Sequence, residues 1–365
     1  MASSANHEIE SPQMRPERGQ VLLRFHLGFP ARSFADLKMP DNAALACLCE
    51  ERGFDTLWHS NQRFYREMFV RMASSAIATT RLGIGGAVAE PFAVHPALTA
   101  QSLASVDELS GGRATLALGA GGSGFEMMGI KRHHSALALR EAYAVIKGLL
   151  AGQEATFEGE IVRAYQARLQ FQLERPTPLW IASRGDLTLE TSGEYADGVI
   201  VATYATAEGI RSAMLLVEKG ARRAGRAVGQ MRIMSRVETC VHRDRQTAYE
   251  GCRETIVASL WSSYPDRGFV RRTGLEVPAE LERLIAKRDY GLVSRAAELL
   301  PDEFVKAFCW AGTPEIVADR VIGISQATGI EEYGFWALLA PGQTREESLG
   351  LIADEVLPRI RSSIA

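Results

Sequence analysis

The stretch RLGIGGAVAEPFAVHPALTAQSLASVDELSGGRATLALGAGG, from Arg81 to Gly122, shows the repeating pattern that decides the fold. Its first part, Arg81–Ala89, is a short apolar run that predicts a β-strand. His95–Leu109 has the spacing of a helix, which a serine and two glycines then end. A second apolar run, Arg113–Gly121, predicts the next strand. Strand, helix and strand in this order indicate a βα unit of a parallel sheet.

The same pattern continues on both sides of this stretch. Further apolar runs predict strands at Val21–Phe29, Phe54–His59, Pro178–Ser183, Asp197–Thr203, Arg232–Val241 and Glu331–Leu338. Strands alternating with helices in this way fit an α/β fold of the closed (β/α)8 TIM-barrel type better than an open sheet. An open dinucleotide-binding sheet needs a G-x-G-x-x-G turn after its first strand, and Gly28-Phe29-Pro30 stands there instead.

Three segments fall outside the repeating pattern. Residues 1–20 are polar without an apolar run, and they predict a flexible leader rather than a targeting signal. Thr156–Phe171 alternates apolar and polar residues and predicts a β-hairpin outside the barrel. Residues 264–309 are too long for one connection, and they predict a helical insertion between strands seven and eight. We therefore expect residues 21–365 to form a single barrel domain.

The composition argues against several classes of partner. Hydrophobic residues make up 46% of the 365-residue chain and the net charge is −3, which gives no reason to expect nucleic acid. The sequence has no apolar run of about eighteen residues, so no membrane partner is expected. The five cysteines show no spacing suited to a metal site, and their odd number indicates a reducing, cytoplasmic location. The expected partner is a small-molecule substrate.

In a barrel of this type the functional residues lie at the carboxyl ends of the strands. Ala182-Ser183-Arg184-Gly185 ends the fifth strand and opens a helix, whose free N–H groups favour a bound phosphate. An ordinary turn capped by Asp186 explains the same residues. Gly119–Gly124 is a glycine-rich exit from the fourth strand, where the backbone either approaches a ligand closely or forms a structural turn. Both interpretations stay open on the residues alone.

Two histidines occupy strand positions near this predicted site. His59 ends the second strand and is expected to point into the mouth of the barrel, whereas His26 lies within the first strand. An imidazole is able to act as a proton donor near neutral pH. Without a named partner, a hydrogen-bonded place in the core is the commoner explanation of each histidine.

Three segments carry a family resemblance: Gly53–Phe64, Arg81–Gly122 and Leu179–Ala202. Together they resemble the luciferase-like superfamily of flavin and deazaflavin oxidoreductases, in the group that contains methylenetetrahydromethanopterin reductase. Their order and spacing match those of that group. The resemblance implies that the barrel mouth holds the ring of FMN or of the 5-deazaflavin coenzyme F-420. It also implies a homodimer.

The resemblance assigns particular residues to the cofactor. It implies a non-prolyl cis peptide between Ala87 and Val88, in a bulge that backs one face of the ring. It places the cofactor phosphate at Ala182, Ser183, Arg184 and Gly185, and the cofactor tail beside Gly121 and Gly122.

One departure from the group concerns the proton donor. Its reductases usually have Trp-x-x-Asp-His at the end of the second strand, where this chain has Trp58-His59-Ser60-Asn61-Gln62. The amides of Asn61 and Gln62 are able to orient a ligand by hydrogen bonds but do not exchange protons at neutral pH. The remaining candidates for the proton donor are His59, His26, Glu90 and Tyr65, in that order.

Three functions fit these observations. The first is hydride transfer from reduced coenzyme F-420 to a small unsaturated, imine or carbonyl substrate. The second is an FMN-dependent monooxygenase that receives reduced flavin from a partner flavin reductase. The third is a cofactor-binding barrel without catalysis. We place the first slightly ahead, because the chain is compact and has no large insertion before its fifth strand.

Overall fold

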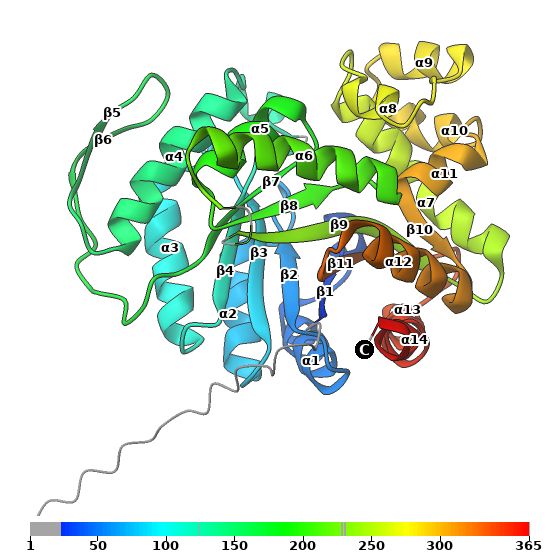
Figure 1. Cartoon of the computed structure of the whole chain (residues 1–365), viewed down its shortest axis with the longest axis horizontal. Helices are drawn as coiled ribbons and strands as arrows, with labels where there is room; N and C mark the ends of the chain where they lie inside the picture. The colour runs from blue at the N-terminus through cyan, green and yellow to red at the C-terminus, as the bar shows by residue number, and fades with distance from the viewer. Residues whose placement is uncertain (1–22, 123, 228, 230, 365) are drawn as a thin grey trace, which may run out of the picture.

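The apolar runs of the sequence form parallel strands that pair in a closed ring (Figure 1). The ring runs β9-β11-β1-β2-β3-β4-β7-β8 and closes because β8 also pairs with β9. These strands are β1 Arg24–Gly28, β2 Thr56–Ser60, β3 Gly83–Ala89, β4 Ala114–Leu118, β7 Leu179–Ser183, β8 Gly198–Ala202, β9 Arg232–Val241 and β11 Glu332–Ala337. The predicted (β/α)8 barrel is confirmed.

The structure is a computed structural model that describes residues 23–122, 124–227, 229 and 231–364. The leader predicted over residues 1–20 and the start of the predicted first strand lie outside this part of the chain. Within it, no helix combines the length and the apolar character that a membrane crossing requires.

Helices cover the outer face of the barrel and follow the strands in sequence. They are α1 Met39–Glu51, α2 Met68–Ala78, α3 Pro96–Leu109, α4 Ser135–Leu150, α5 Asp186–Tyr195, α6 Ala207–Arg223, α12 Pro314–Thr328, α13 Arg345–Gly350, η5 Leu351–Val356 and α14 Leu357–Ile364. The predicted hairpin is present as β5 Ala155–Glu158 and β6 Arg163–Ala167, and it projects away from the barrel beside α3 and α4 (Figure 1).

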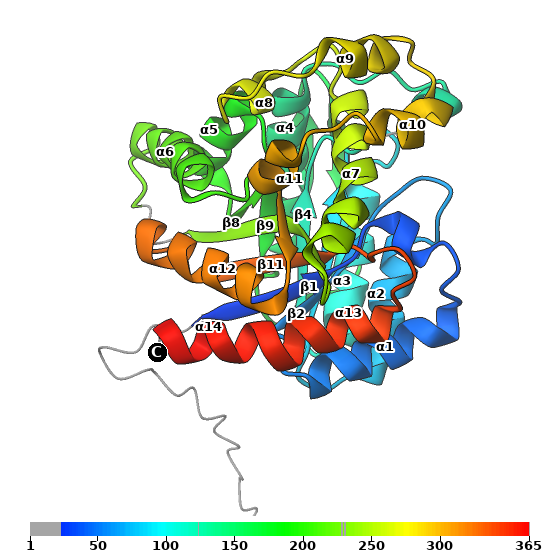
Figure 2. The same ribbon diagram turned by 90° about the vertical axis from the view of Figure 1, so that its right-hand side faces the viewer.

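The helical insertion between the seventh and eighth strands of the ring is also present. It follows α7 Arg245–Ser262 and contains α8 Gly268–Arg271, α9 Ala279–Ala286, α10 Val293–Ala297 and α11 Asp302–Phe308. In two perpendicular views these helices gather at one end of the molecule, and among them α8, α9 and α10 lie farthest from the terminal helix α14 (Figures 1 and 2). The insertion therefore stands over one end of the barrel.

One further strand was not predicted. β10, Cys309–Gly312, pairs with Glu238–Val241 at the end of β9. Because β9 is 10 residues long and β8 pairs with its first half, the second half has backbone N–H and C=O groups that need a partner. The prediction that the insertion extends to Cys309 is therefore wrong at this end, where the chain already forms a strand.

Tryptophan side chains fill the barrel interior, and each faces a glycine of a neighbouring strand. The strand register pairs Trp58 with Gly85, Trp180 with Gly198, and Trp336 with Gly28. A β-carbon added at Gly85, Gly198 or Gly28 would lie 2.4, 2.5 or 2.8 Å from the facing indole. The rings also meet one another, with centroids of Trp58 and Trp180 5.8 Å apart. The interior therefore has room for these indoles only because the facing positions lack side chains.

This packing predicts opposite effects of the same substitution at two glycines. Gly85→Ala should lower the free energy of unfolding by about 1–3 kcal/mol, because the new methyl group overlaps the Trp58 ring. Gly323→Ala, at an exposed position inside α12 with open space around it, should raise it by about 0.5–1 kcal/mol. Urea denaturation of both variants measures the two changes. Equal stability of Gly85→Ala and the wild type would contradict the packing described.

Candidate active site at the barrel mouth

A cavity of about 490 Å³ lies at the carboxyl ends of the barrel strands, as the fold predicts. We call it the inner cavity. It brings together the predicted residues Asn61, Gln62, Ala87, Val88, Gly121, Gly122, Ala182, Ser183 and Arg184. Gly185 does not line it, although it adjoins Arg184 in the chain.

The bulge at the end of β3 forms one wall of the inner cavity. The peptide bond between Ala87 and Val88 is cis, as the resemblance implied, and the register to β4 shifts between Ala87 and Ala89. Asn61 holds this bulge twice: its backbone N–H donates to Ala87 O at 3.1 Å, and its side-chain Nδ2 donates to Val88 O at 3.0 Å. Asn61 therefore fixes the wall and is not a proton donor.

The glycine-rich exit of β4 forms a second wall. A β-carbon at Gly119 would lie 3.0 Å from the Val88 side chain and 3.1 Å from the Ala182 carbonyl oxygen, and Gly121 has a positive φ of 74°. Arg132 donates to the carbonyl oxygens of Ala120 and Gly121 at 3.1 and 2.7 Å. The glycines thus keep this wall free of their own side chains, and the two hydrogen bonds from Arg132 hold the backbone of the loop in place.

The carboxylate of Glu90 has a structural role. Its Oε1 lies 2.9 Å from the guanidinium of Arg63, and its Oε2 accepts from the backbone N–H groups of Phe92 and Ala93 at 2.7 and 3.0 Å. The Arg63 guanidinium in turn lies over the Phe125 ring, 3.8 Å from its centroid. Because the carboxylate is buried and fully engaged, the prediction that Glu90 donates a proton is not supported.

The turn after β7 differs in detail from the predicted phosphate site. Ser183 and Arg184 line the cavity, but the N–H of Gly185 already donates to Ser183 Oγ at 3.1 Å. The Arg184 guanidinium lies over the Phe269 ring of the insertion at 4.4 Å, and burial lowers its pKa. The groups at this turn that could hold an anion are therefore Arg184, Ser183 Oγ and the start of α5, and not the Gly185 amide.

His59 does not reach the mouth, and the prediction that it points there is wrong. Trp58 faces the barrel interior, so the next side chain along β2 faces the helices. His59 is fully buried, and burial lowers the pKa of its imidazole well below the usual value, with the charge of Arg71 on α2 adding to the shift. Neither ring nitrogen has a hydrogen-bond partner among the described residues. His59 is therefore a neutral core residue.

His26 lies inside the barrel but at the end opposite the mouth. Its Nε2 is 3.2 Å from the carboxylate of Glu332, the first residue of β11. Arg232, the first residue of β9, donates to the same carboxylate at 2.8 Å. First residues of parallel strands share the amino-terminal end of the barrel, so the role of His26 in proton transfer at the mouth is also not supported.

Two charged residues at the mouth were missed. Glu238 Oε1 lies 2.7 Å from an Arg236 guanidinium nitrogen, and both side chains line the inner cavity. Glu238 Oε2 is buried and has no hydrogen-bond partner among the described residues. Met234 of the same strand lies in the interior cluster, and residues two apart share a face. The alternation of Met234, Arg236 and Glu238 in the predicted strand is the signal that could have identified them.

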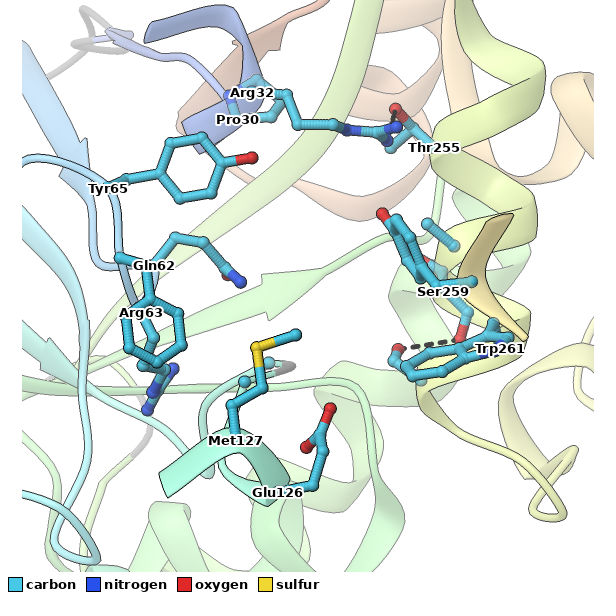
Figure 3. A pocket seen from close by; sticks show the side chains of 16 residues that line it. Pro30, Arg32, Gln62, Arg63, Tyr65, Glu126, Met127, Thr255, Ser259 and Trp261 are labelled. Carbon is cyan, nitrogen blue, oxygen red and sulfur yellow. Dashed lines mark hydrogen bonds between the residues drawn. The ribbon is translucent and has the colours of Figure 1, made fainter. Parts of the chain in front are cut away.

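A second cavity of about 420 Å³ adjoins the first, and we call it the outer cavity (Figure 3). Gln62 and Ser259 line both cavities. Tyr65 lines the outer one, and its ring projects toward the side where Thr255 and Ser259 lie (Figure 3). The mouth therefore has an inner compartment of glycines and charged groups and an outer compartment between the loop after β2 and α7.

The described side chains do not meet the requirements of a metal site. Across the described residues, no group of three or more His, Cys, Asp and Glu side chains is placed to hold a metal ion. The arrangement instead offers a shaped wall, positive charge and one unsatisfied carboxylate oxygen.

Comparisons with known proteins agree with this geometry. The 5,10-methylenetetrahydromethanopterin reductase of Methanolobus tindarius is 27% identical over 86% of this chain and 95% of that protein. The coenzyme F-420-dependent glucose-6-phosphate dehydrogenase of Nakamurella multipartita is 24% identical over 94% of this chain and 98% of that protein. The solved structure of the coenzyme F-420-dependent tetrahydromethanopterin reductase of Methanopyrus kandleri shares the fold, with a TM-score of 0.79, 24% identity and coverage of 93% and 99%.

The family assignment rests on most of the chain. A family model described as luciferase-like monooxygenase matches residues 24–332, which span every strand of the ring up to the first residue of β11. The match includes the cis bulge, the glycine-rich exit of β4 and the turn after β7. The chain belongs to the luciferase-like monooxygenase family.

Proposed function

We propose that this protein transfers a hydride between coenzyme F-420 and a small unsaturated, imine or carbonyl compound. The observation that carries the proposal is the bulge at the end of β3, which Asn61 holds and which faces the inner cavity beside the glycine-rich exit. Relatives named for coenzyme F-420 align with this chain over nearly its whole length. When bound, the coenzyme supplies the ring carbon that gives or accepts the hydride.

The residues of the inner cavity fit an anionic coenzyme. Arg132, Arg184 and Arg236 line it, against the carboxylate of Glu238. Glu238 pairs with Arg236, so the positive charge of the other two arginines is available to anionic groups of a ligand. The wall formed by Gly119, Gly121 and Gly122 admits a flat ligand close to the backbone.

Residues of the chain itself position the ligands and provide a group for proton transfer. Ala87 and Val88 present no polar side chain, so one side of the inner cavity is a fixed apolar wall. The other side opens toward the outer cavity across Gln62, which is where an acceptor molecule fits. Glu238 Oε2, buried and without a hydrogen-bond partner among the described residues, is the group placed to transfer a proton to the heteroatom of the acceptor.

Cofactor titration tests the proposal against its two alternatives. Purified full-length protein should bind coenzyme F-420 with a dissociation constant at or below the micromolar range, and FMN at least about tenfold more weakly, measured by fluorescence quenching side by side. Tighter binding of FMN would instead favour a monooxygenase supplied by a flavin reductase. If neither cofactor binds, the enzymatic assignment fails, and binding without turnover of any acceptor would favour a non-catalytic barrel.

Substitution of Glu238 tests the proton-donor role. Glu238→Gln should lower the kcat of hydride transfer by about 100-fold or more, because an amide does not donate a proton at neutral pH. Its affinity for the coenzyme should change by less than about tenfold. Glu160→Gln, at an exposed position in the turn of the β5–β6 hairpin, is the matched control and should behave as wild type. A kcat of Glu238→Gln within threefold of wild type would remove Glu238 from the mechanism.

A homodimer is proposed on the apolar surface of α2 and α3. Val70 and Ile77 on α2 are 55% and 73% exposed, and Leu98 and Leu109 on α3 are 56% and 48% exposed. Spacings of seven and eleven residues place each pair on one helical face, and the two helices pack side by side. A second copy of the chain would bury this surface. Light scattering should give twice the mass of one chain, and Ile77→Glu should shift it toward a single chain.

A further inference from the structure

We infer that the outer cavity takes an uncharged, flat ring compound as the acceptor, and that Phe64 is one of its contacts. This inference rests on the proposed function and names its substrate class. It depends on three features of the outer cavity: the conformation of Phe64, the aromatic side chains that line it, and the engagement of its cations.

Phe64 occupies a position that is unfavourable for folding in two ways. Its φ is 66°, in the left-handed region that side chains with a β-carbon rarely adopt. The residue is 71% exposed, although an aromatic side chain gains free energy when it is buried. A glycine would suit this backbone better and would expose no apolar surface. A phenylalanine at this place therefore indicates a contact with something other than the described residues of the chain.

Other apolar side chains surround the same space from separate segments. Tyr65 follows Phe64 in the loop after β2, Met127 lies in η2 Glu126–Met128, and Trp261 lies near the end of α7. Figure 3 shows Tyr65, Met127 and Trp261 approaching the cavity from different sides. Met127 is 75% exposed and Tyr65 38% exposed. Such side chains on opposite walls are suited to the faces and edges of a flat ring.

The aromatic pair formed by α7 and the insertion is held in a fixed geometry. Trp261 and Tyr290 meet edge to face, with ring centroids 5.2 Å apart. Arg288 lies over the Trp261 ring at 4.0 Å from its centroid. A wall that is already ordered loses little entropy when a ligand binds, so this side of the cavity is ready to receive a rigid ring. The cavity volume of about 420 Å³ is in the range of small-molecule sites.

The charges of the outer cavity do not favour a phosphate group. Among the described residues that line it, the cations are Arg32 and Arg63. Arg32 lies 3.4 Å from a carboxylate oxygen of Glu254 and donates to the hydroxyl of Thr255 at 3.2 Å. Arg63 is paired with Glu90 at 2.9 Å. Each cation already faces a carboxylate, so a sugar phosphate would gain less from them than from unpaired arginines, and an uncharged acceptor is favoured.

Equilibrium dialysis with menadione, a neutral two-ring quinone, tests the inference, with glucose 6-phosphate as the charged comparison. Full-length protein is dialysed first without added coenzyme and then with saturating coenzyme F-420. Wild type should bind menadione at least tenfold more tightly than glucose 6-phosphate in the arm that contains coenzyme F-420. Phe64→Gly should weaken menadione binding at least fivefold, while its Tm stays equal to or above that of the wild type.

Tyr165→Ala is the matched control, because Tyr165 is an aromatic residue 63% exposed on the hairpin, outside the cavity. It should leave menadione binding unchanged. Tighter binding of glucose 6-phosphate, or wild-type menadione affinity in Phe64→Gly, would overturn the inference. Coenzyme binding is measured separately, so failure of menadione to bind to coenzyme-loaded protein rejects only the substrate class. Failure of the coenzyme to bind, with menadione bound, rejects only the hydride-transfer proposal.

Discussion

The indole–glycine pairs inside the barrel are the constraint on which the mouth depends. A small closed barrel must be filled by side chains, and here Trp58, Trp180 and Trp336 provide that volume. Each needs a facing position without a β-carbon, so the strand register and the packing determine each other. The Arg236 guanidinium lies over the Trp336 ring, 4.6 Å from the ring centroid. The charged groups of the site therefore rest directly on the packed interior.

Local sequence patterns predicted the barrel well because each βα unit carries its own signal. Apolar runs, helix periodicity and glycine stops placed all the strands of the ring, and the structure moves their ends by a few residues. β10 escaped detection because Cys309–Gly312 is a very short run directly after a helix. Its formation depends on the free edge of β9, which is a tertiary feature that no local pattern contains.

The candidate site was predicted less completely, because the side that a strand residue faces changes with every position. The backbone features at Ala87-Val88 and Gly121 needed no such choice, and they lie at the mouth as expected. To place His59, one must know which side chains of β2 face the barrel interior. Trp58 faces the interior, so the adjacent His59 faces the surrounding helices. The same rule applied to β9 leads to Glu238. The missing information was therefore which alternate residues of each strand face the barrel interior, and not which residue types the strands contain.

The amide at position 61 explains why the carboxylate lies elsewhere. Asn61 donates to two adjacent carbonyl oxygens of the bulge, one through its backbone and one through its side chain. An ionised carboxylate at this position offers acceptors only, so it would face the Val88 oxygen with no proton between them. Under the proposed function, a chain that uses this side chain to hold the bulge takes its acid from another strand. Glu238 on β9 is the residue we propose for it, since Arg236, which lies over the Trp336 ring, pairs with one oxygen and the other has no hydrogen-bond partner among the described residues.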